Sequence, residues 1–441
     1  ASIAITYYAK SKTNNNFIIF IATISYVLSS WFLSYYTFTT WLDIFALFPI
    51  YQKGLEDLLD KKKYNTYIIS LALLTISNFY LSFSIYIYTI VYFILYELIY
   101  KQNSKKEKLS KFNIISTMTM ISFILIFAFI YILLDAYLKT GISFDSSING
   151  YTVNIKDFIK SLFYSNTNYI VDLSGPTFPN IACNIFVLIN VFYFFINKNI
   201  DKRTKIFSSI GILLIICVVF FKPFDFILNF FHNVRGLTFR YSFIIIFLSI
   251  KLLIYNLIHI EEQEYKKMLL SIPIILLLFL ISFKNIEFNN RIITICSLLT
   301  YLIALFLYSN NKIHKYLIVF IIIIESFVSL EITTNSYIYS KEYIDYSLYN
   351  KENVKYRLNN MNLDIEDDHR RLQINENLYY NSKVTSFLTS MTYNNVVNLG
   401  INIGCYSYEF SYLECINENE YEKLLFNVKT DDYYLEKIYT A

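Results

Sequence analysis

The sequence predicts a mainly α-helical membrane protein, with a polytopic transmembrane helical bundle of about ten to eleven spans followed by a smaller β-rich or α+β extracytoplasmic domain. Of the 441 residues, 55% are hydrophobic and 19% aromatic, while only 16% are charged. Soluble domains carry about 25% charged residues. Apolar runs long enough to cross a bilayer recur along the chain, and so apolar a chain is not disordered.

The composition also excludes several kinds of site. None of the eight glycines stands in a G-x-G-x-x-G or G-x-x-x-x-G-K motif, so the sequence predicts no nucleotide-binding loop of those kinds. The five cysteines lack the paired spacing of a zinc module, and no metal-ligand set is assigned. A disulfide between Cys405 and Cys415 is left open.

The candidate spans follow the apolar runs. The run Tyr67–Tyr100 would make about 51 Å of helix, so we expect two helices with a turn at the polar Asn78. Thr39–Ile50 is shorter than a span needs, and we expect either a stubby span or a re-entrant segment. Besides Thr39–Ile50, and with the run Tyr67–Tyr100 divided in two, the candidate spans are Phe17–Tyr35, Tyr67–Tyr80, Leu81–Tyr100, Ile114–Tyr137, Ile181–Ile196, Ile206–Phe221, Tyr241–Leu257, Met268–Phe283, Ile292–Leu307 and Tyr316–Leu330.

The basic residues predict the orientation. If Thr39–Ile50 crosses fully and the spans alternate, the loops on one side hold 19 Lys and Arg and the loops on the other side hold 8. Cytoplasmic loops carry the excess of Lys and Arg, so the lysine-rich side is expected to be cytoplasmic. The lysine-rich loops are Lys10–Asn16, Tyr51–Asn65, Lys101–Lys111, Asn197–Lys205, His259–Lys267 and Ser309–Lys315.

The last quarter of the chain differs in charge. Residues 331–441 hold 10 Lys and Arg against 17 Asp and Glu, whereas residues 1–330 hold 28 against 17. We expect residues 1–330 to form the transmembrane domain and residues 331–441 an extracytoplasmic domain that is incomplete here. Because the basic residues belong to membrane-flanking loops, no nucleic acid partner is predicted.

The longest outer loop, Leu138–Asn180, contains one amphipathic stretch. Apolar residues recur there at helical spacing while Asp157 and Lys160 fall on the other face, which predicts a helix lying in the membrane interface. Gly175–Asn180 is expected to direct the backbone into the next span. The apolar face consists of Ile155, Phe158, Ile159, Leu162 and Phe163.

Three groups of polar residues are candidate site residues, because ionisable groups at membrane depth are costly. His232, Arg235 and Arg240, followed by Tyr241, place three potential cations at the outer surface, where Arg and His suit a phosphate or pyrophosphate. The alternative is that Arg240 merely extends its charge to the interface at the start of its helix.

The other two candidate groups lie earlier in the chain. Asp43 is a carboxylate inside an apolar stretch, suited to a cation, a sugar hydroxyl or base chemistry, or else to capping a short helix. Asn78 and Tyr80 lie at an outer turn and suit a polar headgroup or sugar. An Asn that caps the next helix is the competing interpretation.

These landmarks occur in an order that resembles the YfhO family of bacterial multispanning membrane proteins across nearly the whole chain. They are Trp41-Leu42-Asp43 running to Pro49 and Gly54, Asn78-Phe79-Tyr80, Pro179-Asn180, His232, Arg240-Tyr241-Ser242-Phe243 and Leu425-Phe426-Asn427-Val428-Lys429.

The resemblance implies a function. YfhO proteins are similar to GT-C glycosyltransferases, membrane enzymes that transfer a sugar from a polyprenyl-phosphate carrier to an acceptor outside the membrane, here a cell-envelope polymer such as lipoteichoic acid. The implied location is the bacterial cell membrane. His232, Arg235 and Arg240 would hold the carrier phosphate, with Asp43 as a secondary catalytic candidate. The need for a divalent metal is open.

The same resemblance places the main catalytic acid before the start of this chain. The stretch Ala1–Tyr8 reads as the end of a helix already under way, so we expect a fragment that lacks an N-terminal catalytic loop. Two alternatives to the transferase stay open. One is a transporter or flippase of lipid-linked sugars, although the spans are nearly uncharged; the other is a non-catalytic membrane scaffold.

Overall fold

The structure is a computed structural model, and it divides into two compact units that are described separately. It describes residues 1–35, 39–101, 104–132, 152–163, 179–229, 239–286, 288–310 and 312–337, and three short strands after them. The first unit comprises Ala1–Ile126 and Asp145–Ile338, and the second Phe127–Phe144 and Tyr339–Ala441.

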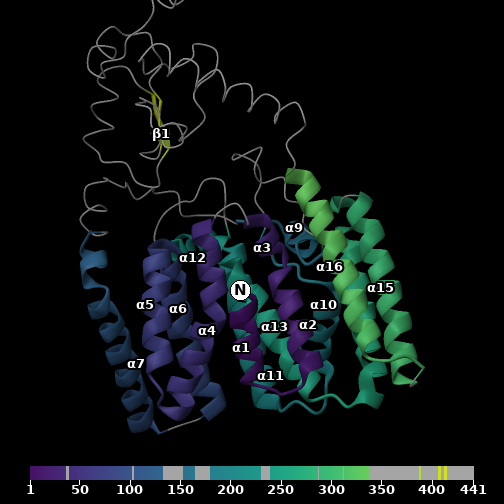
Figure 1. Cartoon of the computed structure of the whole chain (residues 1–441), viewed down its shortest axis with the longest axis horizontal. Coiled ribbons are helices and arrows are strands. Elements are labelled where there is room, and N and C mark those ends of the chain that lie inside the picture. Colours follow the sequence, from purple (N-terminus) through teal and green to yellow (C-terminus); the bar gives the residue numbers. More distant parts are fainter. Residues whose placement is uncertain are drawn as a thin grey trace, which may run out of the picture. The chain divides into compact units, whose positions relative to one another are not determined.

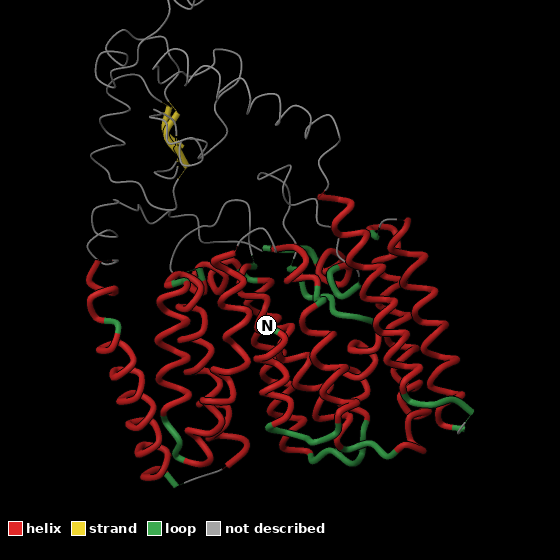
Figure 2. The backbone as a smooth tube through the Cα atoms, in the orientation of Figure 1, coloured by secondary structure: helices red, strands yellow, loops and turns green. Residues whose placement is uncertain are grey.

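The first unit is a bundle of helices that run roughly side by side (Figures 1 and 2). Its α-helices are α1 (Ser2–Lys10), α2 (Asn16–Val27), α3 (Ser30–Tyr35), α4 (Thr39–Lys61), α5 (Asn65–Ser77), α6 (Phe79–Leu95), α7 (Lys105–Leu125), α9 (Ile155–Lys160), α10 (Ile185–Ile196), α11 (Lys202–Phe220), α12 (Lys222–Leu228), α13 (Phe243–Ile258), α14 (Ile272–Ser282), α15 (Phe288–Ser309) and α16 (Tyr316–Tyr337). Shorter or irregular helical segments are η1 (Tyr96–Lys101), η2 (Arg240–Ser242), η3 (Glu262–Ser271) and η4 (Phe283–Asn285).

The described residues contain six helical stretches that are long and apolar enough to cross a membrane. The mainly helical class is therefore confirmed, whereas the expected ten to eleven spans are not. Helices α5 and α10 are apolar but shorter than a span, and two of the predicted spans coincide with them. The six stretches are Asn16–Tyr35, Phe79–Ile99, Lys202–Phe220, Arg240–Ile258, Glu264–Asn285 and Phe288–Ser309.

The second unit contributes three short antiparallel strands in the order β1–β3–β2. They are β1 (Phe387–Leu388), β2 (Tyr406–Tyr408) and β3 (Tyr412–Glu414). Eight strand residues do not define a fold class, so the β-rich or α+β extracytoplasmic domain stays a prediction. Cys405 and Cys415 lie outside the described residues.

The turn predicted at Asn78 is confirmed. Helix α5 ends at Ser77, Asn78 is extended, and α6 begins at Phe79. The Asn78 side chain accepts a hydrogen bond from the backbone N–H of Leu81 at 2.9 Å. This bond satisfies one of the amides that the start of a helix leaves without a partner, which is why one continuous apolar run forms two helices.

Helix α4 corrects the expectation for the segment after Ile50. The predicted loop Tyr51–Asn65 is helical as far as Lys61, so α4 has 23 residues and a length of about 34 Å. Its second half stays helical because polar side chains find partners inside the bundle, as the hydrogen bond from the Tyr88 hydroxyl of α6 to Gln52 illustrates. Thr39–Ile50 is therefore not a stubby helix but the first half of a longer one.

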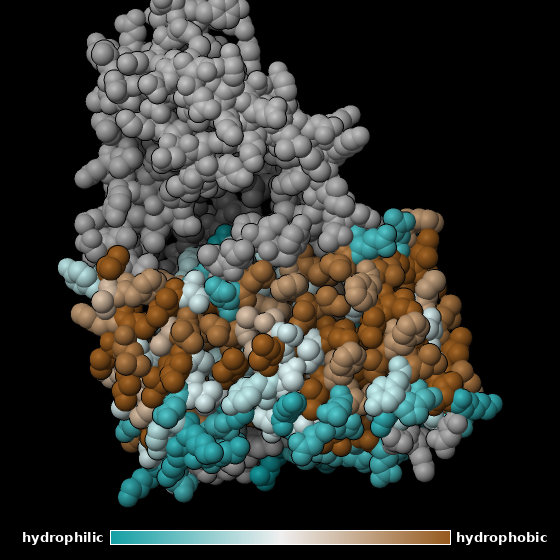
Figure 3. All heavy atoms as spheres, in the orientation of Figure 1, coloured by the Kyte–Doolittle hydropathy of each residue, from teal (hydrophilic) through white to brown (hydrophobic). Residues whose placement is uncertain are grey.

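The polar loops gather at one end of the first unit, where Figure 3 shows a hydrophilic band below the apolar surface. The loop between α1 and α2 and the loop between α10 and α11 lie there. We call this the lysine-rich end and the other the Arg240 end, after a residue described below. Which end faces the cytoplasm stays a prediction from the lysine count.

Close packing of α4 on α5 depends on Gly54. A Cβ atom there would lie 2.7 Å from the backbone nitrogen of Tyr67 and 2.9 Å from the carbonyl carbon of Thr66. Gly54→Ala is therefore expected to force the helices apart and to lower the free energy of unfolding by about 1–3 kcal/mol. Thermal unfolding of the purified protein measures the loss.

Gly211 in α11 provides the matched control, because a Cβ atom at that position meets nothing within 4 Å. Gly211→Ala is expected to be neutral or to stabilise the protein by up to about 1 kcal/mol, since Ala favours a helix over Gly. Equal unfolding temperatures for the two variants would contradict the close approach of α4 and α5.

Candidate functional site

Arg240 brings three separate elements together at its end of the bundle. Its guanidinium carbon lies 4.8 Å from the ring centre of Trp41 in α4 and 5.4 Å from that of Tyr80 in α6. Both distances fit cation–π contacts. We call Arg240, Trp41 and Tyr80 the Arg240 cluster.

The backbone around Arg240 is held in place by neighbouring groups. The indole N–H of Trp31 donates to the carbonyl oxygen of Arg240 at 3.0 Å. The preceding Phe239 is fully buried and has a φ of 56°, a left-handed conformation that a bulky side chain rarely adopts. Burial of Phe239 and the bond from Trp31 together fix the direction in which η2 starts.

The Tyr80 hydroxyl is a buried polar group without a hydrogen-bond partner among the described residues. A buried hydroxyl usually has a partner, because leaving it without one costs free energy. Its ring nevertheless faces Arg240. The Tyr80 hydroxyl is therefore a buried group whose partner the described residues do not supply.

Asp225 in α12 is an acid of this region that the sequence analysis overlooks. The Tyr241 hydroxyl donates to its carboxylate at 2.7 Å, and the Asn229 amide donates to its backbone carbonyl at 3.0 Å. Burial raises the pKa of the Asp225 carboxyl, against the opposing effects of the Tyr241 bond and the charges of Arg240 and Lys222. An acid in the otherwise apolar Pro223–Leu228 was the signal that could have found it.

The structure thus brings together part of the predicted site. Tyr80, Arg240 and Tyr241 lie in one region, and Asn78 caps α6 beside them. Asp43 lies two residues after Trp41 with an exposed side chain. His232 and Arg235 lie outside the described residues, so their role as phosphate ligands stays a prediction.

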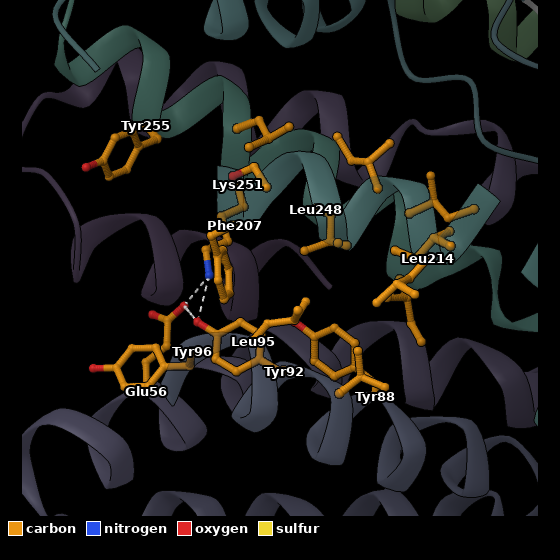
Figure 4. A pocket seen from close by; sticks show the side chains of 18 of the residues that line it. Glu56, Tyr88, Tyr92, Leu95, Tyr96, Phe207, Leu214, Leu248, Lys251 and Tyr255 are labelled. Atoms are coloured by element: carbon orange, nitrogen blue, oxygen red, sulfur yellow. Dashed lines mark hydrogen bonds and ion pairs between the residues drawn. The ribbon is translucent and has the colours of Figure 1, made fainter. Parts of the chain in front are cut away.

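A second feature is a groove of about 400 Å³ between α6, α11 and α13. Its lining on α13 runs from Ile244 to Ile258, which is about 21 Å along the helix axis. Most lining side chains are aliphatic or aromatic, including Tyr88, Leu214 and Leu248 (Figure 4). We call this space the lipid-facing groove, because exposed Leu214 lies on its wall.

Towards the lysine-rich end the groove contains a cluster of charges, the Lys12–Glu56–Lys251 cluster. The Glu56 carboxylate accepts from Lys251 at 2.6 Å and from Lys12 at 2.5 Å. The hydroxyls of Tyr8 and Tyr92 also donate to it, at 3.2 and 3.3 Å. Lys251 bonds the Tyr92 oxygen as well, at 3.1 Å (Figure 4).

This cluster corrects the expectation that the spans are nearly uncharged. Lys251 falls in the middle of the predicted span Tyr241–Leu257, and the sequence analysis gives it no role. Its position inside an apolar run was sufficient signal, because a lysine at membrane depth is costly without a partner. Nothing in the sequence indicates Glu56 as that partner.

Two further buried acids have structural roles. Glu325 of α16 accepts from the backbone N–H of Ile185 at 2.8 Å and from the Tyr301 hydroxyl, so it holds the start of α10. Glu97 pairs with Lys111 at 2.8 Å. In the part of the chain that the structure describes, no group of three or more His, Cys, Asp or Glu is placed to hold a metal ion.

Apolar helices of spanning length, polar ends and buried intramembrane charges define a polytopic α-helical membrane protein. Comparison with protein families identifies the family: residues 1–437 match the one described as bacterial membrane protein YfhO. The chain belongs to the YfhO family. Comparisons with curated proteins and with solved structures found no match.

Proposed function

We propose that the protein is a GT-C-like glycosyltransferase that moves a sugar from a polyprenyl-phosphate carrier to a cell-envelope polymer such as lipoteichoic acid, on the outer face of the membrane. The observation that carries the proposal is the Arg240 cluster, in which a cation, two aromatic rings and a buried hydroxyl from three elements converge at one end of the bundle. Membership of the YfhO family supports it.

Each member of the cluster has a role in the proposed reaction. The Arg240 guanidinium would bind the carrier phosphate and stabilise the negative charge that develops on it as the sugar leaves. The Tyr80 hydroxyl would donate a hydrogen bond to the same phosphate or to the sugar. Trp41 and Tyr80 shield the cation from water, and shielding strengthens its attraction for an anion.

Asp225 would act through Tyr241. Its carboxylate accepts the Tyr241 hydroxyl at 2.7 Å, and Tyr241 directly follows Arg240 in η2. This contact ties η2 to α12, so it would hold Arg240 in register with Trp41 and Tyr80. Asp43, exposed near Trp41, stays a secondary candidate for contacting the acceptor.

A translocation function fits the described groove less well. A flippase for lipid-linked sugars needs polar groups along the route of the headgroup. The described groove instead has its charged groups towards the lysine-rich end and aliphatic side chains such as Ile244, Ile245 and Leu248 beyond them. Sugar transfer at a fixed site needs no such route.

Removing one oxygen tests the proposed site. Tyr80→Phe in the full-length protein is expected to lower the rate of sugar transfer at least tenfold, because a hydrogen bond to a charged group is worth about 1.5–3 kcal/mol. The unfolding temperature should stay unchanged or rise, since the lost hydroxyl has no described partner in the protein. The measurement is transfer of labelled sugar from the carrier to the acceptor in proteoliposomes.

Tyr64→Phe is the matched control, because Tyr64 is 37% exposed at the lysine-rich end. It should leave the rate unchanged. Wild-type rates in both variants would remove Tyr80 from the site. A purified wild-type protein that transfers no sugar would instead reject the proposed function itself.

A further inference from the structure

The lipid-facing groove combines an apolar wall with a cluster of charges. Between Ile244 and Lys251 its lining on α13 is apolar over about 10 Å, about a third of a bilayer core of about 30 Å. Its volume of about 400 Å³ falls within the range of small-molecule sites, about 300–1,000 Å³. Such a space suits a hydrocarbon chain lying parallel to the helices.

The charged part of the groove contains two lysines and two carboxylates. Lys12 and Lys251 share the Glu56 carboxylate, and the side chain of Lys12 is 36% exposed. Asp60 also lines the groove and accepts a hydrogen bond from the Tyr96 hydroxyl.

The rim beside these charges is basic. Thr204 of α11 lines the groove, and it is flanked in the sequence by Lys202, Arg203 and Lys205. Asp201 is the acid of this turn, and it caps α11 through the Thr204 N–H at 2.9 Å. Together with Lys12 and Lys251, these three residues make five cations against the three carboxylates of Glu56, Asp60 and Asp201.

We propose that the lipid-facing groove binds one anionic phospholipid from the leaflet at the lysine-rich end, with its phosphate beside Lys12 and Lys251 and an acyl chain along α11 and α13. Basic pockets between membrane helices bind anionic headgroups in this way. The groove reaches Tyr241, but Arg240, Trp41 and Tyr80 do not line it, and the proposal does not depend on sugar transfer.

Filling the groove tests the position of the acyl chain. Gly211 lines the groove, and a Cβ atom there meets nothing within 4 Å, so Gly211→Trp places a ring in open space. The control is Leu213→Trp on the same helix, at a residue that is 59% exposed and absent from the groove lining. Unfolding temperatures of the two variants show whether both fold.

The full-length protein is equilibrated with vesicles of equal phosphatidylglycerol and phosphatidylcholine, and native mass spectrometry then measures the retained lipid. Wild type and Leu213→Trp should retain one phosphatidylglycerol in preference, and Gly211→Trp should lose it. Lys12→Gln should reduce the preference about fivefold, in line with the contribution of one lysine near an anionic surface. Glu56 keeps Lys251 as its partner in that variant.

Lys10→Gln, at an exposed position two residues before Lys12, should keep the wild-type preference. Equal retention of the two lipids by wild type would overturn the proposal, as would full retention by Gly211→Trp. Adding polyprenyl phosphate to the vesicles distinguishes the other anionic occupant. Its retention in place of phosphatidylglycerol would overturn the assignment to a phospholipid.

Discussion

Arg240→Gln is expected to lower sugar transfer by at least about 100-fold, because removing one preorganised group that stabilises a developing anion costs about 10²–10³ in rate. Glutamine keeps part of the side-chain volume between Trp41 and Tyr80 but has no charge. Protein levels and the unfolding temperature should change little, since the backbone bond from Trp31 does not depend on the side chain. Carrier-to-acceptor transfer in proteoliposomes measures the effect.

Arg291 supplies a closely matched control. It lies in the first turn of α15, and its guanidinium carbon lies 4.7 Å from the ring centre of Phe283. Its nitrogens bond the backbone carbonyls of Ile286 and Lys284 at 2.7 and 3.2 Å, which indicates a structural role for Arg291. Arg291→Gln should transfer sugar at the wild-type rate, and equal losses in the two variants would show that Arg240 has no special role.

Glu56→Gln is expected to cause a large loss of stability, up to about 3 kcal/mol, because it leaves the partly buried Lys251 without its counter-charge. Glu56 receives hydrogen bonds from Lys12, Lys251, Tyr8, Tyr92 and Gln52. Thermal unfolding of the purified protein, followed by size-exclusion chromatography, detects the loss.

The double variant Glu56→Gln/Lys251→Met separates charge from packing. Replacing Lys251 as well removes the more buried of the two lysines that pair with Glu56 and leaves the more exposed Lys12, so it should recover much of the lost stability. Glu264→Gln is a second comparison, because Glu264 pairs with Lys267, whose side chain is 52% exposed, and more exposed pairs contribute less. A Glu56→Gln protein as stable as wild type would contradict the buried cluster.

The sequence was sufficient to predict the helical membrane class, because a run of apolar residues needs no tertiary information to be recognised. It also located the turn at Asn78, where the cap is a contact over three residues. It failed at α4, since the polar residues that continue this helix are satisfied by distant groups. The bond from Lys251 to Glu56 joins residues 195 positions apart.

The candidate site could be predicted only in part, because its residues come together from distant parts of the sequence. Arg240, Tyr241 and Tyr80 were each singled out by their chemistry near a span end, but their convergence depends on how α4, α6 and η2 pack. Trp31 bonds Arg240 across 209 positions, and no local pattern indicates such a contact. Asp225 was not recognised as a site residue, because nothing in the sequence places its partner Tyr241 beside it.

The central claim is that this YfhO protein transfers a sugar from a lipid carrier, and one measurement tests it most directly. The purified full-length protein is placed in liposomes with a polyprenyl phosphate that carries a labelled sugar and with a lipoteichoic acid acceptor. The account predicts that the label moves to the acceptor and leaves free polyprenyl phosphate. Intact labelled carrier, whether unmoved or translocated to the other leaflet, would contradict it.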